Sequence, residues 1–435
     1  MKKIISNVAL LSILFTVFSA CKKNNSQPQE EEEVVKVSSL QNRSEKRGVS
    51  YGFQLMEDVD LLAPGTSWFY NWANDISSEL DVATSAKGME FFPMTWNGNF
   101  SKDKIRAYKQ KHPECEYILA YNEPNLTDQA NMTPQQAAAI FPEVKALADE
   151  LNMKIISPAM NYGTLVGYSD PIKWLDEFFE LVPLSNFDGI ALHCYMATPS
   201  AFKSYVRMFK KYGKPIWMTE FCAWENSISS VTQQMRYMND VVNYMEANPD
   251  VYRYAWFIPR NTGSVESYPF MQLLTKTKPY TLTDLGKVYI NMSTFDKSVY
   301  YTKGNAFSAA HYVALNSTMS ASQEGWQSSV SVRPTTDISG TLEVYRFLTD
   351  QWMEYQIDVP ADGMYKLDLR RASYTDASIE ISVNGIALKT LSLSKTGEDN
   401  VWETTETEIS LNKGKHTLRL KVASGNICLN WLRFR

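Results

Sequence analysis

Two glutamates each stand at the end of an apolar, strand-like run. Glu123 closes the run 117–123 and precedes Pro124, which cannot extend a strand ladder, and Glu220 is the last residue but one of the run 215–221. A carboxylate at the tip of a buried strand costs free energy unless it has a partner or a task, so a stabilising ion pair is the plain alternative. Glycoside hydrolysis needs two such carboxyl groups, one protonated and one ionised. We therefore predict Glu123 as the general acid/base and Glu220 as the nucleophile.

Polar and aromatic side chains lie on or near the tips of other strand-like runs. These residues are Asn122, His193, Tyr195, Trp68, Tyr70, Trp96 and Trp256. We predict that His193 and Tyr195, two apart and so on one strand face, position Glu220 and keep it ionised. Asn122 is predicted to bind the sugar 2-hydroxyl, and the aromatic residues to form platforms for sugar rings. Each residue alone also fits a core role, but their coincidence at strand ends favours a substrate site.

The elements that must position these residues alternate between strands and helices. The candidate strands are residues 48–53, 67–72, 89–96, 117–123, 154–160, 189–195, 215–221 and 251–259, and the clearest helices are 134–151, 171–181, 199–211 and 229–247. This alternation predicts an α/β fold, a (β/α)8 TIM barrel over residues 46–298, whose strands end at one face. An open doubly wound sheet is the alternative, but no glycine-rich dinucleotide loop follows the first strand.

The last third of the chain has a different texture. Residues 305–435 alternate apolar and polar side chains with period two, and Asn384-Gly385 is a hairpin-turn signal. This pattern predicts an all-β, jelly-roll-like sandwich domain.

The N-terminus resembles a bacterial lipoprotein signal. Lys2-Lys3 precede an apolar stretch over 8–18 that is too short to span a bilayer, and the stretch leads into Phe18-Ser19-Ala20-Cys21, which resembles a lipobox. We expect residues 1–21 to be a signal peptide with a lipidated Cys21, and residues 22–45 to be a disordered tether. The acidic run Glu30–Glu33 resembles the surface-export signal of some Gram-negative lipoproteins. The expected location is the outer membrane of a Gram-negative cell, with the face that carries the anchor left open.

The composition of the chain argues against some classes of partner and cofactor. A formal net charge of −5 and the lack of a basic block argue against nucleic acid. The cysteines after Cys21 show no metal-ligand spacing, so no metal or cofactor is expected. Cys115, Cys194, Cys222 and Cys428 are predicted as buried free thiols, with a Cys194–Cys222 disulfide as the alternative.

The ordered motifs of the first domain are similar to those of glycoside hydrolase family 128, which includes the Asl1-like catalytic domains. The motifs are Lys46-Arg47-Gly48, Ser67-Trp68-Phe69-Tyr70-Asn71-Trp72, Tyr121-Asn122-Glu123-Pro124-Asn125, Ser157-Pro158-Ala159 and Trp217-Met218-Thr219-Glu220-Phe221. The resemblance implies retention of anomeric configuration and action on β-1,3-glucan. Asn125 and Cys222 depart from the residues often found in that family, without removing a catalytic group.

The last domain resembles carbohydrate-binding module family 6. The stretches that carry the resemblance are 363–367, 379–385, 401–404 and 430–434. It implies sugar contacts by Trp402, Tyr374 and Asn430. The family's opening Glu-Ala-Glu helps to hold a structural Ca²⁺, and Ser308-Ala309-Ala310 stands here instead, so that ion would lose two carboxylates.

Together these features predict a lipid-anchored retaining endo-β-1,3-glucanase with a sugar-binding module, its partners being the β-glucan and the membrane. One alternative is the same machinery acting on another β-linked polysaccharide. Another is a non-catalytic glycan-binding surface lipoprotein, although both carboxylates are present. Linkage preference, endo or exo action and oligomeric state are left open by the sequence.

Overall fold

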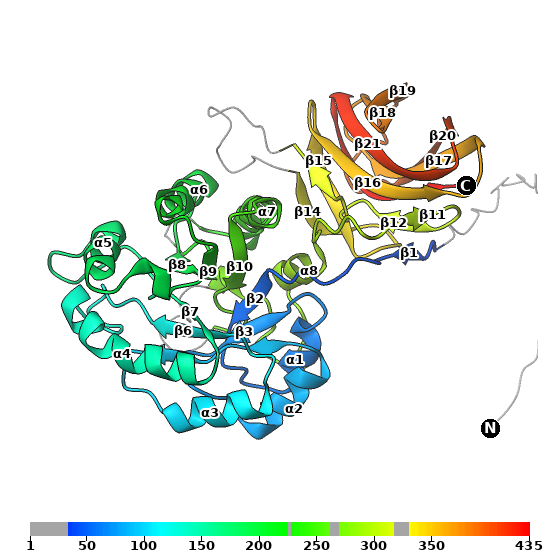
Figure 1. Ribbon diagram of the computed structural model, residues 1–435. Coiled ribbons are helices and arrows are strands. Elements are labelled where there is room, and N and C mark those ends of the chain that lie inside the picture. Colours follow the sequence, from blue (N-terminus) through cyan, green and yellow to red (C-terminus); the bar gives the residue numbers. More distant parts are fainter. Residues whose placement is uncertain (1–33, 225–227, 262–268, 317–329) are drawn as a thin grey trace, which may run out of the picture. The chain divides into compact units, whose positions relative to one another are not determined.

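The computed structural model describes residues 34–224, 228–261, 269–316 and 330–435 (Figure 1). The predicted signal peptide, Cys21 and the acidic run lie outside these residues. Residues 35–435 form one compact unit.

Eight parallel strand positions form the first half of the fold. They are β2 (Arg47–Ser50), β3 (Trp68–Tyr70), β4 (Glu90–Phe91) with its continuation β5 (Met94–Trp96), β6 (Tyr117–Tyr121), β7 (Lys154–Ile156), β8 (Ile190–Cys194), β9 (Ile216–Phe221) and β10 (Val251–Trp256). Hydrogen bonds order them as β4-β3-β2-β10-β9-β8 and β5-β6-β7. Bridges from Ile156 to Gly189 and from Met160 to Leu192 join β7 to β8 and close the ring. The predicted TIM barrel is confirmed.

Helices cover the outside of these strands in Figure 1. They are α1 (Glu57–Leu62), α2 (Ser78–Ala86), α3 (Lys102–Lys111), α4 (Pro134–Glu150), α5 (Pro171–Leu181), α6 (Pro199–Met208), α7 (Val231–Ala247) and α8 (Asp284–Asn291). Their starts follow local rules. Thr133 and Gln136 form a capping box at α4, with Pro134 in the first helical position.

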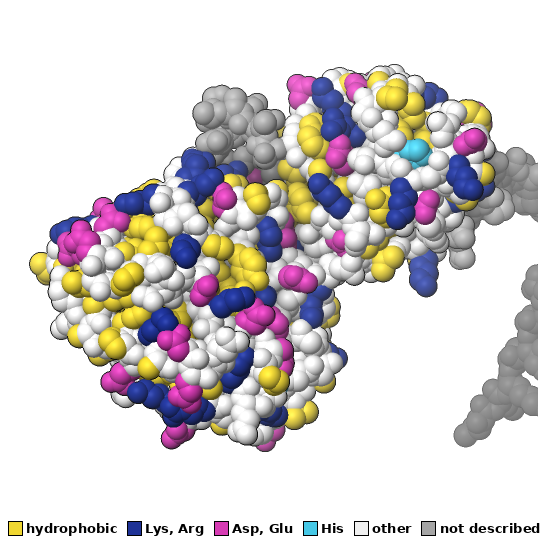
Figure 2. Space-filling view, in the orientation of Figure 1, with side chains coloured by type: hydrophobic (Ala, Val, Ile, Leu, Met, Phe, Trp, Pro, Cys, Tyr) yellow, Lys and Arg dark blue, Asp and Glu magenta, His cyan; other side chains and the backbone are white. Residues whose placement is uncertain are grey.

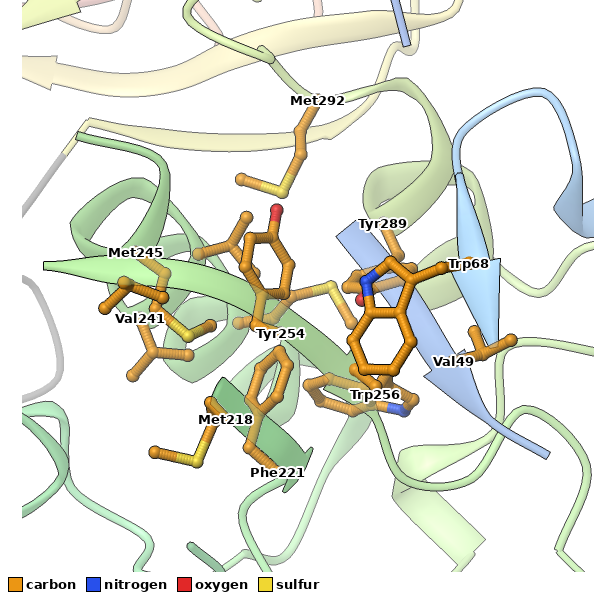
Figure 3. Packing of buried hydrophobic residues seen from close by; sticks show 14 of the residues in the cluster. Val49, Trp68, Met218, Phe221, Val241, Met245, Tyr254, Trp256, Tyr289 and Met292 are labelled. Carbon is orange, nitrogen blue, oxygen red and sulfur yellow. The ribbon is translucent and has the colours of Figure 1, made fainter. Parts of the chain in front are cut away.

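The core between strands and helices is apolar, and a buried arginine sits within it. Figure 3 shows Phe221, Tyr254 and Trp256 of the strands packed with Val241 and Met245 of α7 and Tyr289 of α8. Arg47 is fully buried and pairs with Glu246 at 3.0 Å. Its guanidinium also donates to the hydroxyl of Tyr254 and to backbone carbonyls, so the buried charge is satisfied.

The second half is a β-sandwich, as predicted. One sheet contains β1 (Val37–Ser38), β12 (Ala306–Ser308), β22 (Asn426–Phe434), β15 (Leu342–Leu348), β14 (Ser331–Pro334), β17 (Gly363–Ala372) and β20 (Glu403–Leu411). The other contains β11 (Tyr301–Thr302), β16 (Trp352–Val359), β21 (Gly414–Ser424), β18 (Ala377–Val383), β19 (Ile386–Leu393) and β13 (Ala314–Leu315). Asn384 and Gly385 turn β18 into β19 with φ of 51° and 80°, the left-handed pair that a two-residue hairpin needs.

The predicted disordered tether is wrong for its last residues. β1 pairs in parallel with β12, because the edge of that strand offers unpaired backbone groups. Arg43 donates to the carbonyls of Ala63, Lys87 and Gly88, and the buried Ser44 donates to Glu246. Residues 35–44 are therefore an ordered strap, and only the earlier part of the predicted tether lies outside the described residues.

The four cysteines after Cys21 are buried free thiols, as predicted. Burial raises the pKa of Cys115 to about 12 and that of Cys428 to about 11. These thiols therefore stay protonated and behave as small apolar side chains.

At the position where the module family holds Ca²⁺, the residues present do not fit the ion. Ser308 and Ala310 stand in place of the two glutamates: the hydroxyl oxygen of Ser308 accepts the backbone N–H of Ala310 at 3.2 Å, and the buried Ala310 has no side-chain oxygen. Within the described ranges, no cluster of three or more His, Cys, Asp or Glu side chains is arranged to bind a metal.

Helices in the described part of the chain are all too short or too polar to cross a membrane. On the face shown in Figure 2, basic and acidic side chains are intermingled.

Candidate active site

The carboxyl ends of the barrel strands bring the two predicted glutamates to one site. Glu220 is in β9, and Glu123 follows β6 by two residues. His193 of β8 pairs in register with Glu220. Both carboxylates are almost fully buried, at 6% exposure for Glu123 and 4% for Glu220.

A β-bulge aims Glu220 into the barrel. Trp217 points inward and packs on Trp68 and Tyr117, whereas the next residue, Met218, lies in the outer cluster with α7 (Figure 3). Between Leu192–Met218 and His193–Glu220 the register of β8 and β9 shifts by one residue. The extra residue on β9 reverses the alternation, so Glu220 faces inward beside His193. Bulges of this kind often re-aim a side chain at an active site.

Three donors converge on Glu220. Its Oε1 accepts the hydroxyl of Tyr70 at 2.6 Å and the indole N–H of Trp72 at 2.8 Å, and its Oε2 accepts the hydroxyl of Tyr195. Burial raises the pKa of Glu220 above its ordinary value and the charge of Glu123 adds to this, while His193 and the two phenols oppose it. The donors hold the carboxylate in one orientation.

His193 lies between the two glutamates. Its Nδ1 is 2.9 Å from Oε1 of Glu123, and its Nε2 is 3.5 Å from Oε1 of Glu220. The ring is fully buried, which lowers its pKa, but the charges of Glu220 and Glu123 outweigh burial and the net pKa is raised. An imidazolium here would interact with both carboxylates.

Three residues at these strand ends have a left-handed backbone conformation. Trp72, Trp96 and Glu123 have φ of 60°, 52° and 44°, a region that bulky residues rarely adopt. Each such residue costs roughly 1–3 kcal/mol, and such strain clusters at functional sites. The strain therefore points independently to this end of the barrel.

Two further predicted residues, Asn122 and Trp96, lie near the glutamates. Asn122 donates from Nδ2 to Gln129 at 3.0 Å, while its buried Oδ1 has no hydrogen-bond partner among the described residues. That oxygen is available to accept from a sugar hydroxyl. Trp96 is half-buried at the end of β5.

The predicted platform roles of Trp68, Tyr70 and Trp256 are wrong, because all three rings are fully buried, and Tyr70 instead holds Glu220. Trp68 points inward like Tyr70 but lies two residues, or about 6–7 Å, deeper in the barrel. Its indole donates to the carbonyl of Lys46. Trp256 faces outward, packs on Phe221 and Tyr289, and donates to the carbonyl of Met271 (Figure 3).

The predicted strand 67–72 includes Trp72, but its contact with Glu220 was not predicted, and Trp224 and Phe257 were not predicted as site residues. Trp72 bonds Glu220 and packs edge-on against Phe257. Trp224 lies nearly parallel to Phe257 at 5.6 Å and edge-on to Tyr195 at 4.7 Å, which makes a half-exposed aromatic wall. Trp72 lies two residues after Tyr70, so strand alternation alone places it on the same face. Trp224 and Phe257 lie in loops that follow their strands, where the sequence gives no such signal.

In the sandwich, the three predicted sugar contacts differ in exposure. Tyr374 is 53% exposed, and Trp402 is half-buried with its indole N–H on Thr336. Asn430 is fully buried and donates to Asp337 at 2.7 Å and to the carbonyl of Ser339 at 2.8 Å. The amide donors of Asn430 thus hold the 337–339 loop, and a sugar contact by Asn430 stays a prediction.

Comparison with known proteins gives two family matches and similar solved structures. Residues 48–289 match the model of the glycosyl hydrolase catalytic core, and residues 320–435 match that of carbohydrate binding module family 6. A subgroup II endo-β-1,3-glucanase of glycoside hydrolase family 128 from Pseudomonas viridiflava is 36% identical, with a TM-score of 0.53, over 57% of this chain and 98% of its own. A second, from Sorangium cellulosum, is 30% identical over 56% and 97%, with a TM-score of 0.49.

One curated relative is more distant. Alkali-sensitive linkage protein 1 of Schizosaccharomyces pombe is 23% identical over 259 residues, which are 57% of this chain. The match spans 45% of that relative's length, so this chain corresponds to less than half of it.

Proposed function

Since this chain belongs to the glycosyl hydrolase catalytic core family, and within it to glycoside hydrolase family 128, we propose that it cleaves β-1,3-linked glucan internally and with retention. The observation that carries the proposal is the buried pair Glu123 and Glu220, bridged by His193. The solved relative from Pseudomonas viridiflava, described as an endo-β-1,3-glucanase, supports the substrate.

The chemistry is a double displacement. An oxygen of Glu220 attacks the anomeric carbon, the bond from that carbon to the leaving oxygen breaks, and Glu123 gives its proton to that oxygen. A water molecule then attacks the anomeric carbon while Glu123 takes the water's proton, and Glu220 leaves as a carboxylate. Asn122 would accept a hydrogen bond from the sugar 2-hydroxyl through its unpaired Oδ1.

Paired substitutions test the assignment. Glu123→Gln and Glu220→Gln should each lower laminarin hydrolysis by about 10³-fold or more, since each removes an ionisable group from the reaction. Reducing-end release, product sizing and proton NMR of the first-formed anomer measure rate, endo action and stereochemistry. Near-normal activity in either folded variant would refute the pair, and an inverted product would refute retention. Greater activity on xylan or mannan than on laminarin would favour another β-linked substrate.

We further propose that Cys21 is lipidated and anchors the enzyme in the outer membrane of a Gram-negative cell. The support is the sequence of the first 21 residues alone. Cys21→Ser should move the protein out of the detergent-extracted membrane fraction and abolish labelling by a clickable fatty acid. Unchanged membrane recovery and labelling would exclude the anchor.

A further inference from the structure

We propose that Asn161, in the loop after β7, is a positioning residue that aims the proton of Glu123 at the leaving oxygen. It would do so through a hydrogen bond to Oε1, the carboxyl oxygen of Glu123 that does not carry the proton. This inference rests on the acid/base role proposed above for Glu123.

The orientation of the Asn161 amide follows from its two contacts. Its Oδ1 accepts the backbone N–H of Tyr162 at 2.8 Å. Because the amide oxygen is used there, Nδ2 is the atom that faces Glu123, and it donates to Oε1 at 3.2 Å.

The loop that carries Asn161 is fastened to the loop that carries Glu123. The carbonyl of Asn161 accepts from Nδ2 of the fully buried Asn125, at 2.7 Å. The N–H groups of Thr164 and Leu165 donate to the carbonyl of Asn125, at 3.0 and 2.9 Å. A Cβ on Gly163 would lie 2.3 Å from that carbonyl oxygen, so only glycine allows the approach. Asn161 is thereby held in place relative to Glu123.

Two donors on one oxygen decide where the acidic proton sits. Oε1 of Glu123 accepts a hydrogen bond from Nδ2 of Asn161, and Nδ1 of His193 lies 2.9 Å from the same oxygen and donates the second hydrogen bond when the ring is an imidazolium. A carboxyl oxygen that accepts two N–H groups is the carbonyl-type oxygen of the acid, so the proton belongs on Oε2. In the first step Oε2 gives this proton to the leaving oxygen, and in the second it takes a proton from water. Asn161 donates to Oε1 throughout and keeps the carboxyl plane fixed.

The test uses two substrates that differ in their need for the proton. Laminarin has a poor leaving group, whereas 2,4-dinitrophenyl β-laminaribioside has one that departs without protonation. In the full chain, Asn161→Ala should lower kcat/KM about 10–100-fold on laminarin, within the range of acid catalysis, and less than about threefold on the dinitrophenyl substrate. Asn161→Asp should lose more on laminarin, because it retains the acceptor for Tyr162 but replaces the donor with a charge like that of Glu123.

Two reference variants make the outcome decisive. Thr164→Val removes the bonds of the same loop to Thr127 and should leave both rates unchanged. Glu123→Gln shows the pattern of a lost acid. Equal losses on both substrates in Asn161→Ala, or near-normal laminarin hydrolysis in Asn161→Asp, would overturn the role of Asn161 while Glu123 stands. Near-normal laminarin hydrolysis by Glu123→Gln would instead refute the proposed function, and this inference with it.

Discussion

Glu220 is surrounded by groups that donate hydrogen bonds to it at working pH. Burial, and then the charge of Glu220, hold the pKa of Tyr70 and of Tyr195 well above the ordinary range, so both phenols keep their protons. The indole N–H of Trp72 is a hydrogen-bond donor and cannot accept. The carboxylate is thus fixed by neutral donors, and His193 supplies the nearby positive charge.

The raised pKa of Glu220 predicts the acid limb of activity. The nucleophile must be ionised, so activity should be lost as pH falls through a value above the ordinary 4.5 of a glutamic acid. His193→Gln removes a charge that lowers the pKa of Glu220, so the acid limb should move to still higher pH. The measurement is kcat/KM against pH for both proteins, with circular dichroism to confirm folding. An acid limb at or below 4.5, or one that does not move in the variant, would contradict this account.

At the scale of elements, two properties separate site residues from core residues: how far along its strand a residue lies, and which face of the strand its side chain occupies. Tyr70 and Trp68 share the inner face of β3, but only the residue at the carboxyl end reaches Glu220. The strap 35–44, by contrast, contacts the end of the barrel away from the glutamates. Arg43 bonds the loops that lead from α1 and α2 into β3 and β4, at the amino ends of the strands and away from the glutamates.

Arg43→Ala should therefore lower stability and not catalysis. Loss of three hydrogen bonds to carbonyls should reduce the free energy of unfolding by about 1–3 kcal/mol. Urea unfolding measures this, and kcat/KM on laminarin should stay unchanged. Lys36→Ala, an exposed change in the same strap, is the control and should have little effect. Equal stability of the two variants would show that the strap contributes nothing through Arg43.

At the scale of the whole molecule, the module is expected to concentrate the enzyme on insoluble glucan. Trp402 is the indole best placed for this, since Thr336 fixes its N–H while the side chain remains partly exposed. The accessible Tyr374 offers a second ring.

In an inactive Glu220→Gln background, Trp402→Ala should weaken binding to insoluble β-1,3-glucan about tenfold, equivalent to roughly 1.4 kcal/mol. Depletion isotherms measure this. Trp352→Ala, which removes a half-buried indole stacked under Arg419 in the other sheet, is the matched control and should bind like the parent. Equal weakening by both substitutions, or by neither, would argue against a sugar site at Trp402.

The sequence by itself determined the architecture, because period-two runs, helix caps and the Asn384-Gly385 turn are local signals. It predicted the TIM barrel, the sandwich and the buried thiols, and the structure confirms them. It also singled out Glu123 and Glu220, since a carboxylate at the tip of a buried strand is visible in the sequence alone. The order of the strap was not visible, because residues 35–44 are ordered by partners more than 200 residues away in the chain as well as by nearby loops.

Tertiary structure decided which side chains reach the glutamates. Asn161 meets Glu123 across 38 residues of chain, and Trp72 meets Glu220 across 148. The bulge that turns Glu220 inward reverses the alternation that sequence reading assumes, whereas Trp256 shares the outer face of β10 with Tyr254 by ordinary alternation. The strand face that a side chain occupies, its depth in the barrel and its loop contacts are set only when the strands pair and the barrel closes. The sequence therefore identifies the two carboxylates, whereas the hydrogen bonds around them depend on the tertiary structure.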